Sequence, residues 1–352
     1  MATCSLVFGI LFLNLFGVWC RQRSGLFFGI SYLALYIAND MTIGLDMMGG
    51  DFAPLEAIKG TLQYLEQQNS PAGLLLIGDE SKLTPLLSEY KVPAGKTKII
   101  HAEQVIDMHE HPTKALKEKQ RSSIAIGFHL LASGKIDAFI SAGNTGAMLV
   151  GALFSIKALE GVLRPTISTI IPKENGSTGL LLDVGLNADC KPEQLNQFAV
   201  MGSVFAQTIL GIENPKVGLM NVGEEEGKGN ILCQATYPLL KENKHINFIG
   251  NIEGRDVFID KADVMVCEGF TGNIILKLAE SLYDITQRKN IQHEYFDRFN
   301  FENYGGTPVL GVNKPVVIGH GISQARSFKN MISLAQKMIE KNVMQRMKDE
   351  LV

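Results

Sequence analysis

The amino-acid sequence predicts an α/β protein with three layers, αβα, around a largely parallel sheet. Short apolar runs alternate along the chain with longer segments whose apolar residues recur at helical spacing, an order typical of strands joined by helical crossovers. Most runs are apolar at every position, which indicates strands buried on both faces. The pair Asn175-Gly176 lies between two such runs and predicts one antiparallel hairpin inserted into the sheet.

The first half of the chain shows the alternation most clearly. Apolar runs predict four strands: Thr42–Asp46, Gly73–Ile77, Thr97–His101 and Ala138–Ile140. Helical spacing predicts a helix after each of them: from Pro54, around Leu83–Leu87, through Ile124–Leu131 and at Ala147–Leu159. Residues 103–121 are polar and rich in His and Lys, so we expect a loop there.

The second half follows the same pattern with shorter runs. The predicted strands are Thr166–Ile171, Gly179–Leu182, Val217–Met220, Ile246–Ile249, Val264–Val266 and Pro315–Ile318. The predicted helices begin at Pro192, span Ile231–Lys241, follow Asn273 and, near the C-terminus, run through Phe328–Val343. Residues 283–304 are mixed and polar.

Residues 41–352 are predicted to form one unit with a cleft between two lobes, because no linker rich in Pro, Gly or Ser divides them. In residues 1–40, two apolar runs, Ser5–Trp19 and Gly25–Ala38, flank Arg21-Gln-Arg23. Each run is shorter than the ~20 residues of a spanning helix, and no Lys or Arg precedes the first, which argues against a signal peptide. Either Met41 is the true start and residues 1–40 are an artefact, or they form a membrane segment.

The composition excludes several classes of function. A net charge of −3 gives no basic footprint for nucleic acid. Five scattered cysteines without a Cys-x-x-Cys pair argue for a reducing compartment and against a zinc site or a disulfide framework. No metal or cofactor is predicted, because G-x-G-x-x-G after the first strand and H-E-x-x-H are both absent. The serine elbow G-x-S-x-G is absent too, and Cys267 is expected to be buried and inert.

Six polar glycine turns follow apolar runs and form the candidate site. Because the carboxyl ends of parallel strands meet at one edge of a sheet, we expect these turns to lie together where open α/β sheets bind ligands. Main-chain N–H groups at such turns and at helix N-termini favour an anion. The turns are Met48–Asp51, Gly143–Gly146, Asp183–Asn187, Asn221–Asn230, Gly269–Asn273 and Gly319–Gly321.

The turn Asn221–Asn230 has the clearest anion-binding character, because Lys228 adds a full positive charge to a strand-to-helix turn. It is not a Walker loop: three residues rather than four separate Gly223 from Gly227, and Gly229 replaces the metal-binding Ser or Thr. Three consecutive glutamates would repel a triphosphate. We therefore expect a small anion, and the alternative is a solvated charged turn.

Seven short motifs occur in one order: Asp46–Asp51, Ser141–Ala147, Leu182–Gly185, Asn221–Gly223, Phe248–Asn251, Gly269–Asn273 and Asn303–Gly306. In these motifs the chain, from Met41 almost to its C-terminus, resembles the bacterial phosphate acyltransferases (the PlsX family, acyl-acyl carrier protein:phosphate transacylases). The resemblance implies a homodimeric αβα fold akin to phosphate acetyltransferases and isopropylmalate dehydrogenase-like enzymes. It also implies transfer of an acyl group from acyl carrier protein to orthophosphate.

Position in these motifs implies roles for single residues. Lys228 is expected to bind phosphate or the oxyanion, and Asn273 to orient the thioester. His320, which lies between two glycines, is expected to act as a polar catalytic group at the site, and the alternative is that it caps a turn. Phosphate is itself a nucleophile, so the enzyme need only position it and stabilise developing charge. The residues expected to bind substrates are Asp46, Gly49, Gly50, Asn144, Thr145, Gly146, Asp183, Asn221, Gly223, Gly229, Thr271 and Gly272. For the polar ones, the alternative is that they cap glycine turns.

Four basic residues match a basic helix start in the family: Lys114, Lys117, Lys119 and Arg121. They are expected to dock the acidic carrier protein, and the alternative is a solvated face. The resemblance also implies that acyl phosphate passes to a membrane glycerol-3-phosphate acyltransferase for phospholipid synthesis, and that the protein is cytoplasmic or peripheral at the inner face of the membrane. Residues 274–302 are shorter than in many relatives, so membrane docking through an apolar hairpin tip is in doubt.

Three other functions stay open at this level. A phosphate acetyl- or butyryltransferase that uses coenzyme A would share the fold. A decarboxylating dehydrogenase of related architecture would need a carboxylate cluster for a divalent metal and an Arg-rich pocket, and neither is evident. A non-catalytic, membrane-associated scaffold for lipid enzymes is suggested only by residues 1–40.

Overall fold

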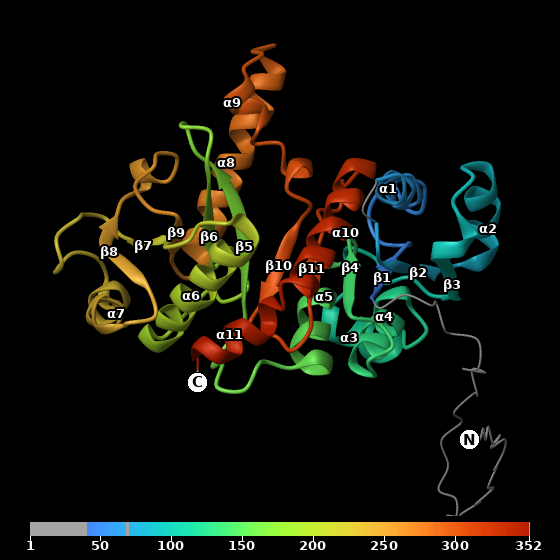
Figure 1. The fold of residues 1–352 in the computed structure, drawn as a ribbon, viewed down its shortest axis with the longest axis horizontal. Helices are drawn as coiled ribbons and strands as arrows, with labels where there is room; N and C mark the ends of the chain where they lie inside the picture. The colour runs from blue at the N-terminus through green and yellow to red at the C-terminus, as the bar shows by residue number, and fades with distance from the viewer. Residues whose placement is uncertain (1–40, 68–69, 352) are drawn as a thin grey trace, which may run out of the picture. The chain divides into compact units, whose positions relative to one another are not determined.

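Eleven strands form one sheet in the part of the chain that this computed structural model describes, residues 41–67 and 70–351 (Figure 1). The hypotheses about residues 1–40 lie outside the described residues. The strands are β1 (Thr42–Asp46), β2 (Gly73–Gly78), β3 (Thr97–His101), β4 (Ala138–Ser141), β5 (Thr166–Pro172), β6 (Thr178–Leu182), β7 (Lys216–Met220), β8 (Asn247–Ile252), β9 (Val264–Val266), β10 (Thr307–Leu310) and β11 (Val316–Ile318).

The sheet consists of two parallel blocks that run in opposite directions. The first block has the order β3-β2-β1-β4-β11 and the second block the order β6-β9-β7-β8, and each is parallel throughout. Between the blocks lie β10 and β5, which pair antiparallel with each other and with both neighbouring strands. Three successive reversals therefore leave the second block antiparallel to the first.

This topology corrects the expectation that all six glycine turns meet at one edge. The turns after β1, β4 and β11 lie at the carboxyl edge of the first block, whereas those after β6, β7 and β9 lie at the opposite edge of the sheet. That expectation was wrong because it assumed one strand direction for the whole parallel sheet, and the β5–β6 hairpin reverses it.

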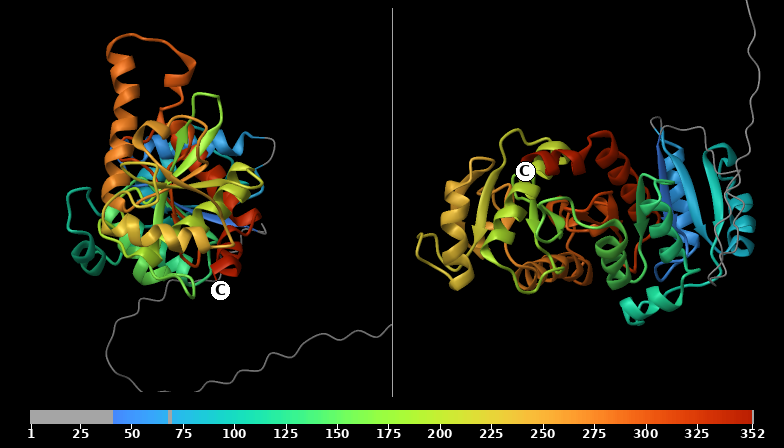
Figure 2. Two further views of the ribbon diagram at one scale, coloured as in Figure 1. Left: turned by 90° about the vertical axis from the view of Figure 1, so that its left-hand side faces the viewer. Right: turned by 90° about the horizontal axis from the view of Figure 1, so that it is seen from below.

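Helices cover both faces of the sheet, which confirms the three-layer prediction (Figure 2). On the first block α1 and α10 pack together on one face, and α4 and α5 cover the other. On the second block α6 and α7 lie on the face opposite α8. The helices are α1 (Leu55–Leu65), α2 (Glu80–Glu89), α3 (Pro112–Glu118), α4 (Ser123–Ala132), α5 (Thr145–Gly151), α6 (Pro192–Phe205), α7 (Ile231–Glu242), α8 (Gly269–Arg288), α9 (Glu294–Asp297), α10 (Ala325–Glu340) and α11 (Val343–Leu351).

The contact between α1 and α10 depends on a glycine. A Cβ at Gly60 would lie 2.4 Å from the Cβ of Phe328 and 2.6 Å from the carbonyl oxygen of Ala325. The bare backbone at this position lets the two helices approach closely and bury the predicted apolar face of α10, on which Phe328 and Ile332 are almost fully covered.

Several elements differ from the sequence prediction. Strand β10 was not predicted, because Pro308 and the flanking Gly306 and Gly311 are typical of a loop. Helix α3 lies inside the expected polar loop, and α8 extends to Arg288. The C-terminal helix is divided at Asn342, whose φ of 51° ends α10 in the left-handed conformation common at helix termini.

The predicted hairpin at Asn175-Gly176 is confirmed, and its tip is firmly held. Lys173 is 1% exposed and its ammonium group contacts Asp263 at 2.7 Å and Asp260 at 3.0 Å. The guanidinium of Arg298, which follows α9, donates to the carbonyl oxygen of Lys173 at 3.0 Å. The insertion that carries α9 is thereby joined to the end of the two central strands (Figure 1).

In the described part of the chain, every helix is too short or too polar to cross a bilayer.

Candidate active site

A cavity of ≈ 600 Å³ lies over β5, between the two blocks. Residues from Ile167 to Pro172 line it, so it runs along the strand and reaches turns at both edges of the sheet. From the first block it receives α5 and the turn after β11, and from the second block the turn after β6 and one side of α8. Three predicted catalytic or binding residues line it: Thr145, Asn273 and His320. Its size is typical of a small-molecule site.

On the second block, the carboxylate of Asp183 organises the end of the cavity. It accepts hydrogen bonds from the backbone N–H groups of Gly185, Leu186 and Asn187 at 3.1, 3.1 and 2.7 Å. The side chain of Asn187 donates a fourth at 2.7 Å. Burial raises the pKa of this carboxyl above its ordinary value of 3.8, and these hydrogen bonds oppose the rise. The side chain is fully buried, so the geometry favours the turn-capping alternative, and direct contact of Asp183 with substrate stays a prediction.

Asn273 is held against the same turn. Its amide nitrogen donates to the carbonyl oxygen of Val184 at 3.1 Å, which leaves a second N–H for a ligand. One residue earlier, a Cβ at Gly272 would lie 1.8 Å from the carbonyl oxygen of Asp183. Only glycine allows the first turn of α8 to approach this closely, so Gly272 positions Asn273 through backbone packing.

On the first block, Asp46 holds two glycine turns together. Its carboxylate accepts from the N–H of Met48 at 2.9 Å and from the hydroxyl of Ser141 at 2.6 Å, and that hydroxyl accepts from the N–H of Gly143 at 2.9 Å. A Cβ at Gly49 would lie 2.6 Å from the nitrogen of Gly143. Burial raises the pKa of Asp46 above 3.8. Like Asp183, Asp46 is buried and satisfied inside the fold.

The turn after β4 leaves main-chain donors open at the cavity. Asn144 caps α5 by accepting from Ala147 at 2.9 Å, and its amide nitrogen donates to three carbonyl oxygens of residues 107–110. The backbone N–H groups of Asn144, Thr145 and Gly146 have no acceptor among the described residues. Because Thr145 lines the cavity, this helix start offers donors to a negatively charged group there.

The turns after β1 and β11 also contribute to this part of the cleft, through the backbone of Asp51 and the imidazole ring of His320. The N–H of Asp51, next to Gly50, donates to Gly321 at 2.8 Å, which ties the turns after β1 and β11 together. The ring of His320 lies 5.1 Å from that of Phe301, is exposed and faces the cavity. His320 is therefore within reach of a ligand in the cleft.

A second hollow of ≈ 310 Å³ lies on the other side of the first turn of α8. Asn221, Gly229 and Thr271 line it, whereas Lys228 and Gly223 line neither this hollow nor the cleft. The predicted residues that line a hollow thus form two groups, Thr145, Asn273 and His320 in the cleft and the other three here, with the first turn of α8 between the two hollows.

The charges around Lys228 leave its ammonium group unpaired. Glu224 contacts Lys261 at 2.6 Å and Glu226 contacts Lys241 at 2.9 Å, so two of the three glutamates are neutralised by other lysines. Lys228 is exposed and forms no ion pair within the described residues. A free cation next to an Asn- and Gly-rich turn is a suitable anion ligand.

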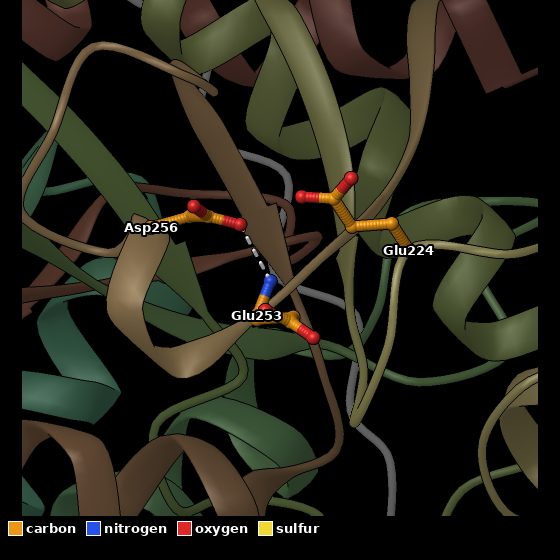
Figure 3. Close-up of side chains that lie close together, drawn as sticks. All are labelled: Glu224, Glu253 and Asp256. Carbon is orange, nitrogen blue, oxygen red and sulfur yellow. Dashed lines mark hydrogen bonds between the residues drawn. The ribbon is translucent and has the colours of Figure 1, made fainter.

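Three carboxylates, Glu224, Glu253 and Asp256, converge next to this turn (Figure 3). Lys261 lies between two of them, 2.6 Å from Glu224 and 2.7 Å from Asp256. Arg255 contacts Glu253 at 2.5 Å. Since lysine and arginine already supply the positive charge, the cluster is an ion-pair network.

The cysteines near α8 are poor nucleophiles. Cys267 is buried and burial raises its pKa well above the ordinary value of 9.0. Burial raises the pKa of Cys190 to about 12. The thiol and not the reactive thiolate is therefore the stable form, which agrees with a mechanism that needs no cysteine.

The predicted docking residues divide into two pairs. Lys119 donates to the carbonyl oxygen of Val105 at 2.7 Å and is paired with Glu110, and Arg121 contacts Glu103 at 3.1 Å. Lys114 and Lys117 lie on α3, are exposed, and form no ion pair in the described part of the chain. Of the four, these two have free charges to offer a partner.

Sequence reasoning missed the apolar half of the cleft. Ile171, Pro172, Phe299, Phe301 and Tyr304 all line it. The sequence of β5 indicated a buried strand and gave no sign of a cavity. Phe299 and Tyr304 lie in the segment that was interpreted as mixed and polar. The three aromatic residues within six positions were the available signal.

Comparisons with known proteins agree with this architecture. A family model described as "Fatty acid synthesis protein" matches residues 41–346. A Dictyoglomus turgidum protein named "Phosphate acyltransferase" is 43% identical over 326 residues, 86% of this chain and 95% of the relative. One of the same name from Halothermothrix orenii is 43% identical over 331 residues, 88% and 98% of the two chains.

Comparison with solved structures supports the predicted fold. A phosphotransacetylase from Streptococcus pyogenes superposes with a TM-score of 0.62 at 19% identity, over 86% of this chain and 95% of that one. The predicted likeness to phosphotransacylase folds is thereby confirmed. From the family model and the close relatives together, the chain belongs to the phosphate acyltransferase family and is an acyltransferase.

Proposed function

We propose that this protein transfers a fatty acyl group from acyl-acyl carrier protein to orthophosphate and releases acyl phosphate and free carrier protein. The observation that carries the proposal is the cleft over β5, which has the amide side chain of Asn273 at one edge of the sheet, the open main-chain donors of residues 144–146 at the other edge, and apolar side chains along its walls. A long acyl chain needs such walls, because each methylene removed from water contributes roughly 0.8 kcal/mol. An acetyl group would leave most of the cavity unfilled.

The reaction needs positioning and charge stabilisation more than covalent chemistry. An oxygen of phosphate attacks the thioester carbon, the carbonyl oxygen becomes an oxyanion, and the carbon–sulfur bond then breaks to release the carrier's thiolate. In our proposal the free N–H of Asn273 binds the carbonyl oxygen. Donors fixed before the reaction are effective because they require no reorganisation as charge develops.

Lys228 is the proposed phosphate ligand. Its ammonium group is unpaired although three glutamates precede it, which supports a role in which the charge is reserved for an anion. The hollow next to Asn221, Gly229 and Thr271 lies between the Lys228 turn and α8. We propose that phosphate approaches from this side. His320 and the N–H groups of residues 144–146 are proposed to act from the first block.

Carrier-protein docking is proposed on α3. Residues 107–110 are held by Asn144 and contribute Met108 and His109 to the cleft, and α3 follows them directly. The unpaired Lys114 and Lys117 would thus lie near the entrance, where they can attract an acidic partner. By family resemblance we further propose a homodimer, a cytoplasmic or peripheral location, and delivery of acyl phosphate to a membrane glycerol-3-phosphate acyltransferase.

The reaction is tested with the purified full chain, palmitoyl-acyl carrier protein and orthophosphate. Hydroxylamine traps acyl phosphate as a hydroxamate, and free carrier protein is measured by its thiol. We expect release of carrier protein that depends on phosphate. Turnover with acetyl- or butyryl-coenzyme A alone would point to the alternative transferase, and no turnover with any donor would support the scaffold.

Two substitutions test the site. Lys228→Ala should raise the KM for phosphate at least tenfold, because a charge-assisted contact is lost. Asn273→Ala should lower kcat about 10²- to 10³-fold, the usual effect of removing one oxyanion donor. Lys135→Ala, an exposed lysine elsewhere on the first block, is the matched control and should behave as wild type. Wild-type kinetics in both site variants would disprove the assignment.

A further inference from the structure

We propose that the cleft limits the length of the acyl chain that the protein accepts, and that the ring of Phe299 sets this limit at the end of the cleft. The inference rests on the proposed function and adds a determinant of specificity. The acyl carbonyl lies at Asn273, and the chain extends along β5 until its methyl end meets the ring of Phe299.

The side walls of the cleft are strand β5 and helix α8. Ile167 lies beside the turn that holds Asn273, since its carbonyl oxygen accepts from the N–H of Val184 at 3.1 Å. From Ile167 to Ile171 the strand rises about 13 Å at roughly 3.3 Å per residue. Opposite it, the lining part of α8 from Asn273 to Glu280 rises about 10 Å at 1.5 Å per residue.

The segment that follows α9 lies at the far end of the cleft. Phe299 lines the cavity but is only 6% exposed. Its neighbour Arg298 donates to the carbonyl oxygen of Lys173, the residue after the last residue of β5, at 3.0 Å. One position later, Asn300 donates to the hydroxyl of Tyr283 on α8 at 3.3 Å. Phe299 is thus fixed to both walls at the end remote from Asn273.

The ring of Phe299 is held rigidly enough to act as a stop. It packs edge-on against Phe258 at 5.4 Å between centroids and against Tyr295 at 5.2 Å. Neither of these two rings lines the cavity. Edge-to-face aromatic clusters prefer this geometry, so a longer chain cannot displace the ring without breaking two aromatic contacts.

The test is the chain-length profile of kcat/KM, measured by hydroxamate trapping with dodecanoyl-, myristoyl-, palmitoyl- and stearoyl-acyl carrier protein. Phe299→Ala should raise the ratio of myristoyl to dodecanoyl activity at least tenfold, because an extended twelve-carbon chain is already about as long as the strand wall. One buried methylene contributes ~0.8 kcal/mol, about a fourfold effect. Ile171→Phe, which adds a ring to the same end of the cleft, should shift the profile in the opposite direction, toward shorter chains.

Phe248→Ala is the matched control, because its ring packs edge-on against Tyr237 at 5.2 Å, does not contact Phe299 and does not line the cavity. It should lower the melting temperature and keep the wild-type ratio. If Phe299→Ala and Ile171→Phe change all four rates by one common factor, the proposed limit on chain length is refuted, whereas the proposed transfer reaction is not. If the wild-type protein releases no carrier protein with phosphate, the proposed function itself fails.

Discussion

Two buried carboxylates, Asp46 and Asp183, serve to shape the loops around the cleft. Each accepts hydrogen bonds from the backbone of its own glycine turn, and burial raises the pKa of each above 3.8. Charge placed here costs desolvation energy, and the hydrogen bonds offset part of that cost. Polar residues in glycine turns therefore mark a site even where they bind no ligand.

The raised pKa of Asp46 has a consequence for stability. A carboxyl that binds its proton more tightly in the folded than in the unfolded state contributes stability below pH 3.8, and this contribution is lost as the pH rises through the folded pKa. The non-titrating variant Asp46→Asn does not lose it. We expect the free energy of unfolding of Asp46→Asn, relative to wild type, to increase from pH 3.8 toward neutrality in urea titrations.

Parallel curves for Asp46→Asn and wild type would contradict the assigned direction of the pKa.

At the residue scale the sequence could identify the turns but not the direction of each side chain. Whether an aspartate faces a ligand or the N–H groups of its own turn depends on the exposure of the turn in the fold, and Asp183 and Thr145 occupy similar glycine-rich contexts. The unpaired charge of Lys228 is a second property that the sequence could not predict. Its free charge follows from Lys241 and Lys261, which are distant in sequence from the glutamates they neutralise.

Helix α8 connects the two hollows of the site, and its first turn sets their separation. Gly272→Ala should displace that turn, since the added Cβ would meet the carbonyl oxygen of Asp183 at 1.8 Å. Alanine would otherwise favour a helix by about 1 kcal/mol. The expected net result is a loss of roughly 1–3 kcal/mol in unfolding free energy, typical of overpacking, with a reduced kcat because Asn273 moves with the turn.

Gly95→Ala is the matched control, because no atom lies within 4 Å of its added Cβ. Denaturant unfolding and steady-state kinetics measure the two effects. A Gly272→Ala protein as stable and active as wild type would show that the first turn of α8 is not tightly packed.

Elements with strong local signals were predictable, and those defined by tertiary contacts were not. The Asn175-Gly176 turn gave the β5–β6 hairpin directly. Strand β10 contains Pro308 and is flanked by glycines, and it becomes a strand only because β11 and β5 lie on either side of it. The length of α8 was missed because its last residues, from Tyr283 to Arg288, fall in the segment that was interpreted as mixed and polar.

For the whole molecule, the decisive feature is that one cavity receives residues from two blocks of opposite direction. A ligand in the cleft should therefore protect both blocks together. In hydrogen–deuterium exchange, palmitoyl phosphate, the product of the proposed reaction, should slow exchange in residues 145–149, 273–280 and 319–322. Protection of the second block alone would show that the acyl chain lies outside the cleft, and α2 serves as an internal reference.

The opposite strand directions of the two blocks are the part of the fold that the sequence did not predict. Apolar runs indicate buried strands but carry no information on strand direction, so one edge was assumed for all the turns. The hairpin at Asn175-Gly176 held the missing information, because one antiparallel turn reverses every strand that is later paired in parallel with β6. The layers and the family motifs were predictable, whereas the composition of the cleft required the pairing of the whole sheet.

The seam between the blocks is narrow. Strands β10 and β5 share only two aligned residue pairs, Val309 with Ile167 and Leu310 with Thr166, whereas β1 and β2 share five. This is the shortest strand pairing in the sheet, since every other pairing aligns at least three residues. The two blocks are therefore joined across the floor of the cleft by fewer aligned residues than any other two neighbouring strands, and a ligand that spans the cleft would bridge the sheet at this shortest pairing.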